Sequence, residues 1–292
     1  MPVAVVTDST ASLSAEQVTR LGLWVVPVAV LIAGPDGTPQ PATDTAAVAD
    51  ALRTRRTVTT SRPSPSAFAA TYAAAAAAGA TAVVSVHLSG AMSGTVDAAR
   101  LAADGASVPV TVVDSRVAAA ALGFAVTDAA RAAAAGAPAP DVAAAAARRA
   151  AATTTVFFVD SVEYLRRGGR VGTAEALIGS ALSVRPLLRL VDGSIARAEK
   201  VRTTARALAR LEELAVAAVV AAPGAGEAQV DVCVQHVAAA VRAAALADAL
   251  SARLPRLASL RVAEVGAVLA AHVGPGSLAV VVAPRAGPDA QG

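Results

Sequence analysis

Residues 82–103 read AVVSVHLSGAMSGTVDAARLAA, and this stretch predicts how the N-terminal half of the chain folds. An apolar run from Ala82 to His87 is followed by a serine- and glycine-rich turn, and then by an alanine-rich segment from Gly94 to Ala103. A fully apolar strand is typical of a parallel sheet that is covered on both faces. We therefore expect a buried strand, a polar turn and a helix in this order.

The same alternation of apolar and alanine-rich segments fills the first 160 residues. Ser14 to Gln17 has the pattern of a capping box, which marks the start of a helix. Alternating strands and helices predict an α/β fold with a mostly parallel sheet and helices on both faces. The predicted strands are Val3–Thr7, Trp24–Ile32, Ala82–His87, Val108–Val113 and Val156–Val159.

The pattern changes after Asp160. A short helix closed by glycines is expected over residues 162–170, followed by a helix from Ala174 to Ser183. Asp192-Gly193 between two apolar runs is a hairpin signal. We therefore predict an N-terminal domain at residues 1–160, a C-terminal α/β domain with a mixed sheet at 161–284, and a disordered tail at 285–292.

Composition excludes several classes of function. The chain has 292 residues, of which 55% are hydrophobic and only 2% aromatic, with a net charge of +3. Few aromatic side chains leave little for stacking nucleic-acid bases. No segment has the roughly 20 strongly apolar residues of a membrane span, and no signal peptide is recognised. The single cysteine, Cys233, rules out disulfides within the chain, and we expect a cytoplasmic protein without stable membrane insertion.

Two turns carry clusters of hydroxyl groups, at residues 59–64 and 89–95. Free N–H groups at the start of a helix favour an anion, and Gly94 allows a ligand to approach the backbone. Ser64 precedes Pro65 and is interpreted as a helix cap, whereas Thr60 and Ser61 are able to face a ligand. Neither turn contains a base of its own, so the hydroxyls are poor nucleophiles. The pattern favours binding of an acidic group over bond cleavage.

Three predicted strands end in the pair Asp-Ser, at Asp8, Asp114 and Asp160. These residues are natural helix caps. They would also meet at the carboxyl ends of parallel strands, where open α/β sheets bind ligands. A magnesium site built from the three carboxylates is a weaker alternative, and we expect no metal and no cofactor.

Histidines and arginines give further candidates. His87 and His236 follow apolar strands and are interpreted as core or edge residues, whereas His272 precedes a Gly-Pro-Gly turn and has either a binding role or a purely structural one. Motifs of known catalytic sites are absent, so no catalytic residue is assigned. Arginine clusters that include Arg170 and Arg202 form either a solvated face or a docking patch for an acidic or phosphate-carrying partner.

Taken in order, these segments resemble the DegV family of fatty-acid-binding proteins, from about Val3 to Val282. The resemblance is carried by Thr7-Asp8-Ser9-Thr10, Thr60-Ser61-Arg62-Pro63-Ser64, Ser93-Gly94-Thr95, Val113-Asp114-Ser115, Glu163 to Arg170, Arg185-Pro186-Leu187-Leu188, Asp192-Gly193, Lys200-Val201-Arg202-Thr203 and His272 to Gly276.

The resemblance implies a two-domain α/β protein with a long-chain fatty acid between the domains. It implies that Thr60 and Ser93, with the backbone at Ser61 and Gly94, hold the carboxylate, and that His272 lies near this headgroup. It further implies presentation of the acid to a separate fatty acid kinase that makes acyl phosphate, with Arg202 as a contact.

This chain departs from the family at two positions. Arg62 and Val96 stand where relatives often have glutamine and an aromatic residue. Two other functions stay open: an acyl hydrolase that uses Ser93 with His272, and a lipid-sensing regulatory module with a different partner.

Overall fold

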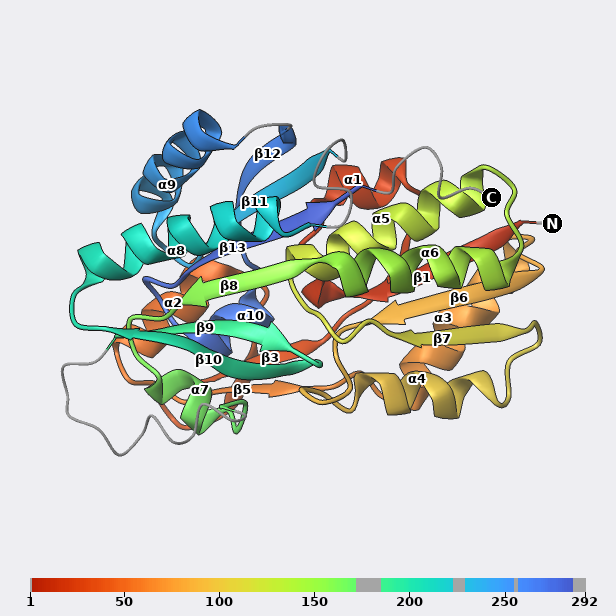
Figure 1. Ribbon diagram of the computed structural model, residues 1–292. Coiled ribbons are helices and arrows are strands. Elements are labelled where there is room, and N and C mark those ends of the chain that lie inside the picture. The colour runs from red at the N-terminus through yellow and green to blue at the C-terminus, as the bar shows by residue number, and fades with distance from the viewer. Residues whose placement is uncertain (1, 172–184, 223–228, 255–256, 286–292) are drawn as a thin grey trace. The chain divides into compact units, whose positions relative to one another are not determined.

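The computed structural model describes residues 2–171, 185–222, 229–254 and 257–285 (Figure 1). The chain divides into two compact units. The first unit comprises Met1–Ala29 and Thr60–Ala151, and the second comprises Val30–Thr59 and Ala152–Gly292.

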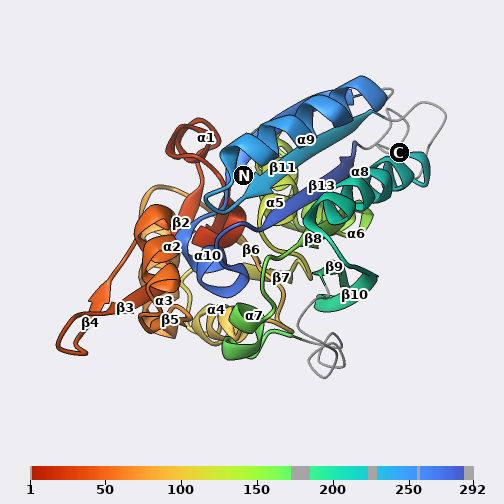
Figure 2. The same ribbon diagram turned by 90° about the vertical axis from the view of Figure 1, so that its left-hand side faces the viewer.

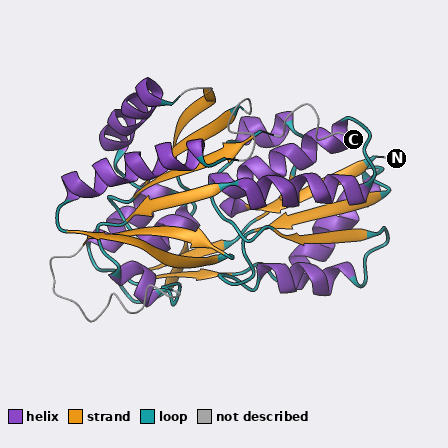
Figure 3. Ribbon diagram, in the orientation of Figure 1, coloured by secondary structure: helices purple, strands orange, loops and turns teal. Residues whose placement is uncertain are grey.

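The first unit contains a four-stranded sheet in which every neighbouring pair is parallel, in the order β2-β1-β6-β7. Helices lie on both faces of this sheet (Figure 3). Phe68, Tyr72 and Ala99, from the two helices α3 and α4, pack against Val6 and Val83 of the strands. The elements are β1 (Val3–Asp8), η1 (Ser9–Ala11), α1 (Ala15–Arg20), β2 (Trp24–Val26), α3 (Pro65–Ala77), β6 (Ala82–His87), α4 (Thr95–Ala103), β7 (Val110–Asp114), α5 (Ala120–Ala134) and α6 (Ala139–Ala152).

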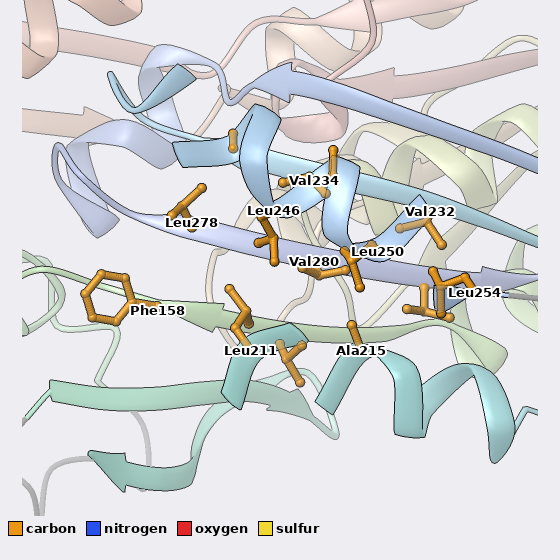
Figure 4. Packing of buried hydrophobic residues seen from close by; sticks show 14 of the residues in the cluster. Phe158, Leu211, Ala215, Val232, Val234, Leu246, Leu250, Leu254, Leu278 and Val280 are labelled. Atoms are coloured by element: carbon orange, nitrogen blue, oxygen red, sulfur yellow. The ribbon is translucent and has the colours of Figure 1, made fainter. Parts of the chain in front are cut away.

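The second unit contains a six-stranded mixed sheet, in the order β10-β9-β8-β13-β11-β12, in which only the pair β11–β12 is parallel. Its main core lies between this sheet and two helices, where side chains such as Leu211, Leu250 and Val280 interlock (Figure 4). The elements are β8 (Thr154–Phe158), β9 (Arg185–Val191), β10 (Ser194–Val201), α8 (Thr204–Val220), β11 (Val230–His236), α9 (Ala240–Arg253), β12 (Leu257–Glu264) and β13 (Leu278–Pro284).

Smaller elements complete the second unit. A three-stranded sheet has the order β4-β3-β5, and its strand β5 runs into the first hydroxyl turn. The helix α10 packs against α2 and α7 (Figure 2). The elements are β3 (Ala29–Ala33), β4 (Pro39–Pro41), α2 (Thr45–Arg53), β5 (Val58–Ser61), α7 (Glu163–Arg167) and α10 (Ala267–Val273).

The predicted fold class is confirmed, and so are several local signals. Ser14 and Gln17 form the reciprocal capping box. Asp192 and Gly193 both have positive φ, at 50° and 79°, as the tight turn between β9 and β10 requires. The helix expected from Ala174 to Ser183 lies outside the described residues.

Two strand predictions were wrong. The run from Trp24 to Ile32 is not one strand, because it divides between β2 and β3, which belong to different sheets. Pro27 lies at the break, where its missing N–H group interrupts a ladder. The strand predicted at Val156–Val159 does not join the parallel sheet, since β8 pairs antiparallel with both β9 and β13 in the second unit.

The compact units differ from the predicted domains in two segments, since residues 152–160 and Val30–Thr59 both fall in the second unit. Val30–Thr59 belongs with the C-terminal part of the chain, where Thr45 donates a hydrogen bond to the carbonyl of Val265 over 2.9 Å. At the other end, Arg285 begins the predicted tail, and its guanidinium pairs with the buried carboxylate of Asp231 at 2.7 Å. The residues after Arg285 lie outside the described part of the chain.

Candidate ligand-binding site

The second hydroxyl turn, residues 89–95, connects β6 to α4 in the first unit. The backbone N–H groups of Met92 and Ser93 both donate to the carbonyl of Ser89, which makes the turn compact. The hydroxyls of Ser93 and Thr95 share a hydrogen bond of 2.8 Å. Gly94 is the N-cap residue of α4, and no side chain caps this helix. The turn therefore presents a hydroxyl and a helix N-terminus, both of which stabilise an anion.

The first hydroxyl turn, residues 59–64, is built differently. Ser64 caps α3 by accepting a hydrogen bond from the N–H of Ala67, as the sequence predicts, and Pro65 occupies the first helical turn. Thr60 is half-buried and Ser61 is exposed. The two turns meet inside the first unit, because the guanidinium of Arg62 lies against the backbone of Gly94. Thr60, Ser61, Ser93 and Gly94 thus all belong to the two turns that this contact joins.

A chain of buried hydrogen bonds fixes the end of β6 immediately before the second turn. Tyr72 donates to the hydroxyl of Ser85 over 2.9 Å, Ser85 and Nε2 of His87 are 2.6 Å apart, and Nδ1 of His87 is 3.0 Å from Oδ2 of Asp8. Oδ2 of Asp8 also accepts the backbone N–H of Leu88. The carboxylate at the end of β1 therefore holds the backbone that leads into the turn. These five residues are called the buried relay below.

Electrostatics match this arrangement. Burial raises the pKa of Asp8, but the hydrogen bonds from His87, Thr10 and Leu88 together outweigh burial, and the net pKa is lowered. Burial raises the pKa of Tyr72 to about 12, so its hydroxyl remains a donor. One consistent set of donors runs from the Tyr72 hydroxyl to Ser85, from the Ser85 hydroxyl to Nε2 of His87, and from Nδ1–H of His87 to Asp8.

The order Asp8, His87, Ser85 is also the order of groups in a serine hydrolase triad. Ser85 and His87 are each 0% exposed, and Ser85 faces Tyr72 in the core. A substrate has no access to a hydroxyl in this position. The relay is therefore structural, which agrees with the interpretation of His87 as a core residue.

The end of β7 fixes the other side of the second turn. Oδ1 of Asp114 accepts the N–H groups of Gly90 and Arg116, each over 3.0 Å. The hydroxyl of Ser115 donates to the carbonyl of His87 over 2.6 Å. A β-carbon at residue 90 would stand 2.8 Å from Oδ2 of Asp114, so glycine is needed there. The carboxylates that end β1 and β7 both hold this turn.

The third Asp-Ser pair does not join them, so the expectation that all three gather at one sheet edge was wrong. Asp160 follows β8 in the mixed sheet, and its carboxylate pairs with Arg242 at 3.5 Å. Ser161 accepts the N–H of Glu163 at the start of α7. Within the described ranges, no group of three or more His, Cys, Asp or Glu side chains is arranged to hold a metal ion.

His272 lies in the second unit, at the end of α10. Its ring lies against Gly168, where a β-carbon would be 3.1 Å from Cε1 of the imidazole. Burial, assisted by the positive charge of Arg170, lowers the pKa of His272 to about 4, so the ring is neutral at physiological pH. Neutral imidazole serves as a hydrogen-bonding group rather than as a charge.

Two other glycines shape the same region. Gly274 has φ +75°, and a β-carbon there would stand 2.8 Å from Cγ of the Tyr164 ring. Gly276 has φ +86° and lies against the carboxylate of Asp160, whose Cγ would be 2.8 Å from an added β-carbon. The segments Glu163–Arg170 and His272–Gly276, which the sequence marked separately, are therefore packed together. We call His272, Tyr164, Gly168 and Gly274 the glycine cluster.

Several arginines of the two clusters form ion pairs with glutamates. Arg166 and Arg167 both pair with Glu163, and Arg210 pairs with Glu199 and Glu213, which fits a solvated face for these residues. Arg170 and Arg202 are exposed. Arg202 immediately precedes Thr203, which caps α8.

The two remaining candidates are buried. Cys233 is 0% exposed, and burial raises the pKa of its thiol to about 11, so the reactive thiolate is suppressed. His236 is buried at the end of β11.

Among the described residues, no helix combines the length and the apolar character needed to cross a bilayer.

Sequence reasoning did not find the residues that hold the second turn in place. Asp8 and Asp114 were noticed because they end apolar strands, and they were interpreted as helix caps. Their hydrogen bonds to the backbone of residues 88 and 90 were not predicted. Packing partners of Gly168, Gly274 and Gly276 have no local sequence signal, since they come from distant segments.

The fold and the site together identify the class of protein. It is a two-unit α/β protein in which one unit has a parallel sheet and the two joined hydroxyl turns, and the other has a mixed sheet. The model of the DegV family matches residues 2–285, and the chain belongs to this family. It is 52% identical over 285 residues to the DegV domain-containing protein SCO2569 of Streptomyces coelicolor, covering 97% of this chain and 99% of that protein.

Two solved structures extend the comparison. A DegV family protein from Thermus thermophilus, described by its fatty acid binding, has a TM-score of 0.88 and 31% identity, covering 98% of this chain and 100% of that one. DegV of Bacillus subtilis, a fatty acid binding protein, has a TM-score of 0.86 and 28% identity, with coverage of 98% and 100%. The resemblance recognised in the sequence is thus confirmed.

Proposed function

We propose that this protein binds a long-chain fatty acid and presents it to a separate ATP-dependent fatty acid kinase that forms the acyl phosphate. The observation that carries the binding step is the meeting of the two hydroxyl turns at the uncapped N-terminus of α4. Fatty acid binding by the Thermus and Bacillus relatives supports the choice of ligand. In this proposal the protein is a carrier and is not itself an enzyme.

The proposed headgroup contacts are the hydroxyls of Thr60 and Ser93 and the backbone at Ser61 and Gly94. The family resemblance adds His272 to them. Each hydrogen bond to a charged carboxylate contributes roughly 1.5 to 3 kcal/mol. Burial of about fifteen methylenes contributes about 12 kcal/mol before ordering costs. The acyl tail therefore dominates affinity, and the turns select and orient the acid.

Native mass spectrometry of the purified protein tests the binding step. We expect a bound mass that matches a long-chain fatty acid. Ser93→Ala and Thr60→Ala should weaken retention roughly tenfold or more while folding is unchanged, since each removes a hydrogen bond to a charge. Ser107→Ala, at an exposed hydroxyl, is the control. Equal lipid retention in all four proteins would contradict the assignment of the turns.

The kinase step rests on the family resemblance, with Arg202 and Arg170 as the proposed docking residues. Arg202→Ala should leave lipid occupancy unchanged and lower the rate of acyl phosphate formation by a fatty acid kinase. Arg148→Ala, at an exposed arginine of α6, is the matched control. Equal rates in both variants would remove Arg202 from the docking surface.

Two other outcomes would redirect the proposal. A stoichiometric burst with an activated acyl ester, abolished by Ser93→Ala, would identify an acyl hydrolase. Lipid-dependent capture of a partner that forms no acyl phosphate would identify a lipid-sensing regulatory module.

A further inference from the structure

Arg62 is the side chain that joins the two hydroxyl turns. It follows Ser61 in the first turn, and its side chain lies on Gly94 of the second. A β-carbon added to Gly94 would stand 3.0 Å from Cδ and 3.1 Å from Cζ of Arg62. The Arg62 side chain can therefore keep this position only if residue 94, the N-cap of α4, is a glycine. A larger residue there would push the guanidinium away.

The surroundings of Arg62 favour an external anion. The N-terminus of α4 carries a partial positive charge and no side-chain cap, so it does not neutralise a guanidinium. The acidic residue in the first turn of α4, Asp97, pairs with Arg100 at 3.6 Å, and Asp114, which holds the second turn, accepts the N–H groups of Gly90 and Arg116. In the described part of the first unit, no carboxylate pairs with Arg62. Two positive groups thus converge on the turn that carries Ser93.

We propose that Arg62 is the charge-selecting residue of the headgroup site. This inference rests on the proposed binding function and adds to it. Thr60 and Ser93 offer hydroxyls that bind a neutral alcohol nearly as well as an acid, because a hydroxyl both donates and accepts hydrogen bonds. A guanidinium stabilises an ionised acid and gives no comparable gain with a neutral headgroup. Arg62 therefore makes the site retain ionised acids in preference to neutral acyl compounds of the same length.

Two substitutions separate charge from shape. Arg62→Gln keeps a polar, hydrogen-bonding side chain and removes the charge. Arg62→Lys keeps the charge but loses the planar fork that matches a carboxylate. Arg62 is exposed, so both variants should fold. Arg148→Gln removes another exposed arginine of the first unit, on α6, and is the control.

The experiment measures binding of dodecanoic acid and of 1-dodecanol to the delipidated full-length protein at pH 8, at low and high salt. In the wild type we expect the acid to bind more tightly than the alcohol, with an affinity that falls as salt rises. Arg62→Gln should lose about tenfold of the preference for the acid, with alcohol binding unchanged. Arg62→Lys should lose less, and Arg148→Gln should behave as the wild type.

Each other outcome is decisive. An unchanged preference and an unchanged salt dependence in Arg62→Gln would overturn the inference. Equal losses for acid and alcohol would also overturn it, because Arg62 would then position the turns without selecting charge. A wild-type protein that binds neither of these compounds and also fails to bind hexadecanoic acid would instead refute the proposed binding function.

Discussion

The buried relay and the glycine cluster are held in place by opposite means. Before the second hydroxyl turn, the carboxyl groups of Asp8 and Asp114 accept backbone N–H groups, so the turn is fixed by hydrogen bonds to polar side chains. Around His272, Gly168 and Gly274 leave the space that the rings of His272 and Tyr164 fill, so the region is fixed by the absence of β-carbons. A hydrogen-bonded turn tolerates small displacements, whereas close packing against glycine does not.

The largest effect should come from Gly274→Ala. The backbone at residue 274 has φ +75° and ψ 167°, which is favourable only for glycine, and the new methyl would collide with the ring of Tyr164. Strain and overpacking together should destabilise the second unit by roughly 3 to 4 kcal/mol. Urea unfolding, with hydrogen exchange of α7 and α10, measures this loss.

Gly169→Ala is the matched control for this packing argument. Gly169 also has positive φ, at +68°, but nothing lies within 4 Å of an added β-carbon. It should cost about 1 kcal/mol, from backbone strain alone. Equal losses at residues 169 and 274 would mean that Tyr164 imposes no packing constraint.

The next largest effect should come from Asp8→Asn. The amide keeps the size of the side chain but places an NH₂ group where the carboxylate accepted donors from His87, Thr10 and Leu88. We expect a loss of about 2 to 3 kcal/mol in the free energy of unfolding. Asp104→Asn, at an exposed position in the same unit, should change stability by less than about 0.5 kcal/mol. A small loss in Asp8→Asn would show that the relay is not held by charge.

The two regions should lose stability over different pH ranges, because the pKa values of their ionisable groups differ. The folded protein keeps His272 neutral down to about pH 4, whereas the unfolded chain protonates it near 6.5. The unfolded state therefore binds more protons between these values, and stability falls as pH is lowered through this window. The lowered pKa of Asp8 acts in the other window: its contribution is present above the unfolded value and is lost as pH falls through the folded pKa, below about 4.

His272→Gln isolates the first window. The wild type should lose about 2 kcal/mol through His272 between pH 8 and pH 5, and the variant should lack this part of the decline. Urea unfolding at closely spaced pH values measures the two slopes. Identical slopes would mean that the imidazole titrates in the fold as it does in water.

The elements of the first unit were largely predictable from the sequence, and their pairing was not. Val-rich runs and a capping box are local signals, so strands such as β1 and β6 were found nearly residue by residue. The sheet to which β8 belongs depends on β9 and β13, which are distant in the chain. Pro27 does indicate the break between β2 and β3, but it was overlooked because the whole run from Trp24 to Ile32 is apolar. The helix α10, which carries His272, is only seven residues long and lacks a side-chain cap, and it was not predicted.

The candidate site shows the same limit. The hydroxyl turns were identified because serine, threonine and glycine cluster in the sequence. The side chains that hold the second turn, Asp8 and Asp114, follow other strands and are brought to it only by the parallel sheet. Arg62 was recognised as a departure from the family, but its contact with Gly94 is visible only in the structure.

The smallest effect on stability should come from Gly94→Ala, which sharpens the contrast with Gly274. Gly94 has φ −73°, a value that alanine adopts freely, and the three atoms nearest to an added methyl all belong to the flexible side chain of Arg62. Stability should therefore change by less than about 0.5 kcal/mol, with Gly105→Ala, which has open space, as control. Displacement of the guanidinium should nevertheless lower the affinity for dodecanoic acid about as much as Arg62→Gln does. Loss of stability without loss of acid binding would show that the Arg62–Gly94 contact serves the fold and not the headgroup.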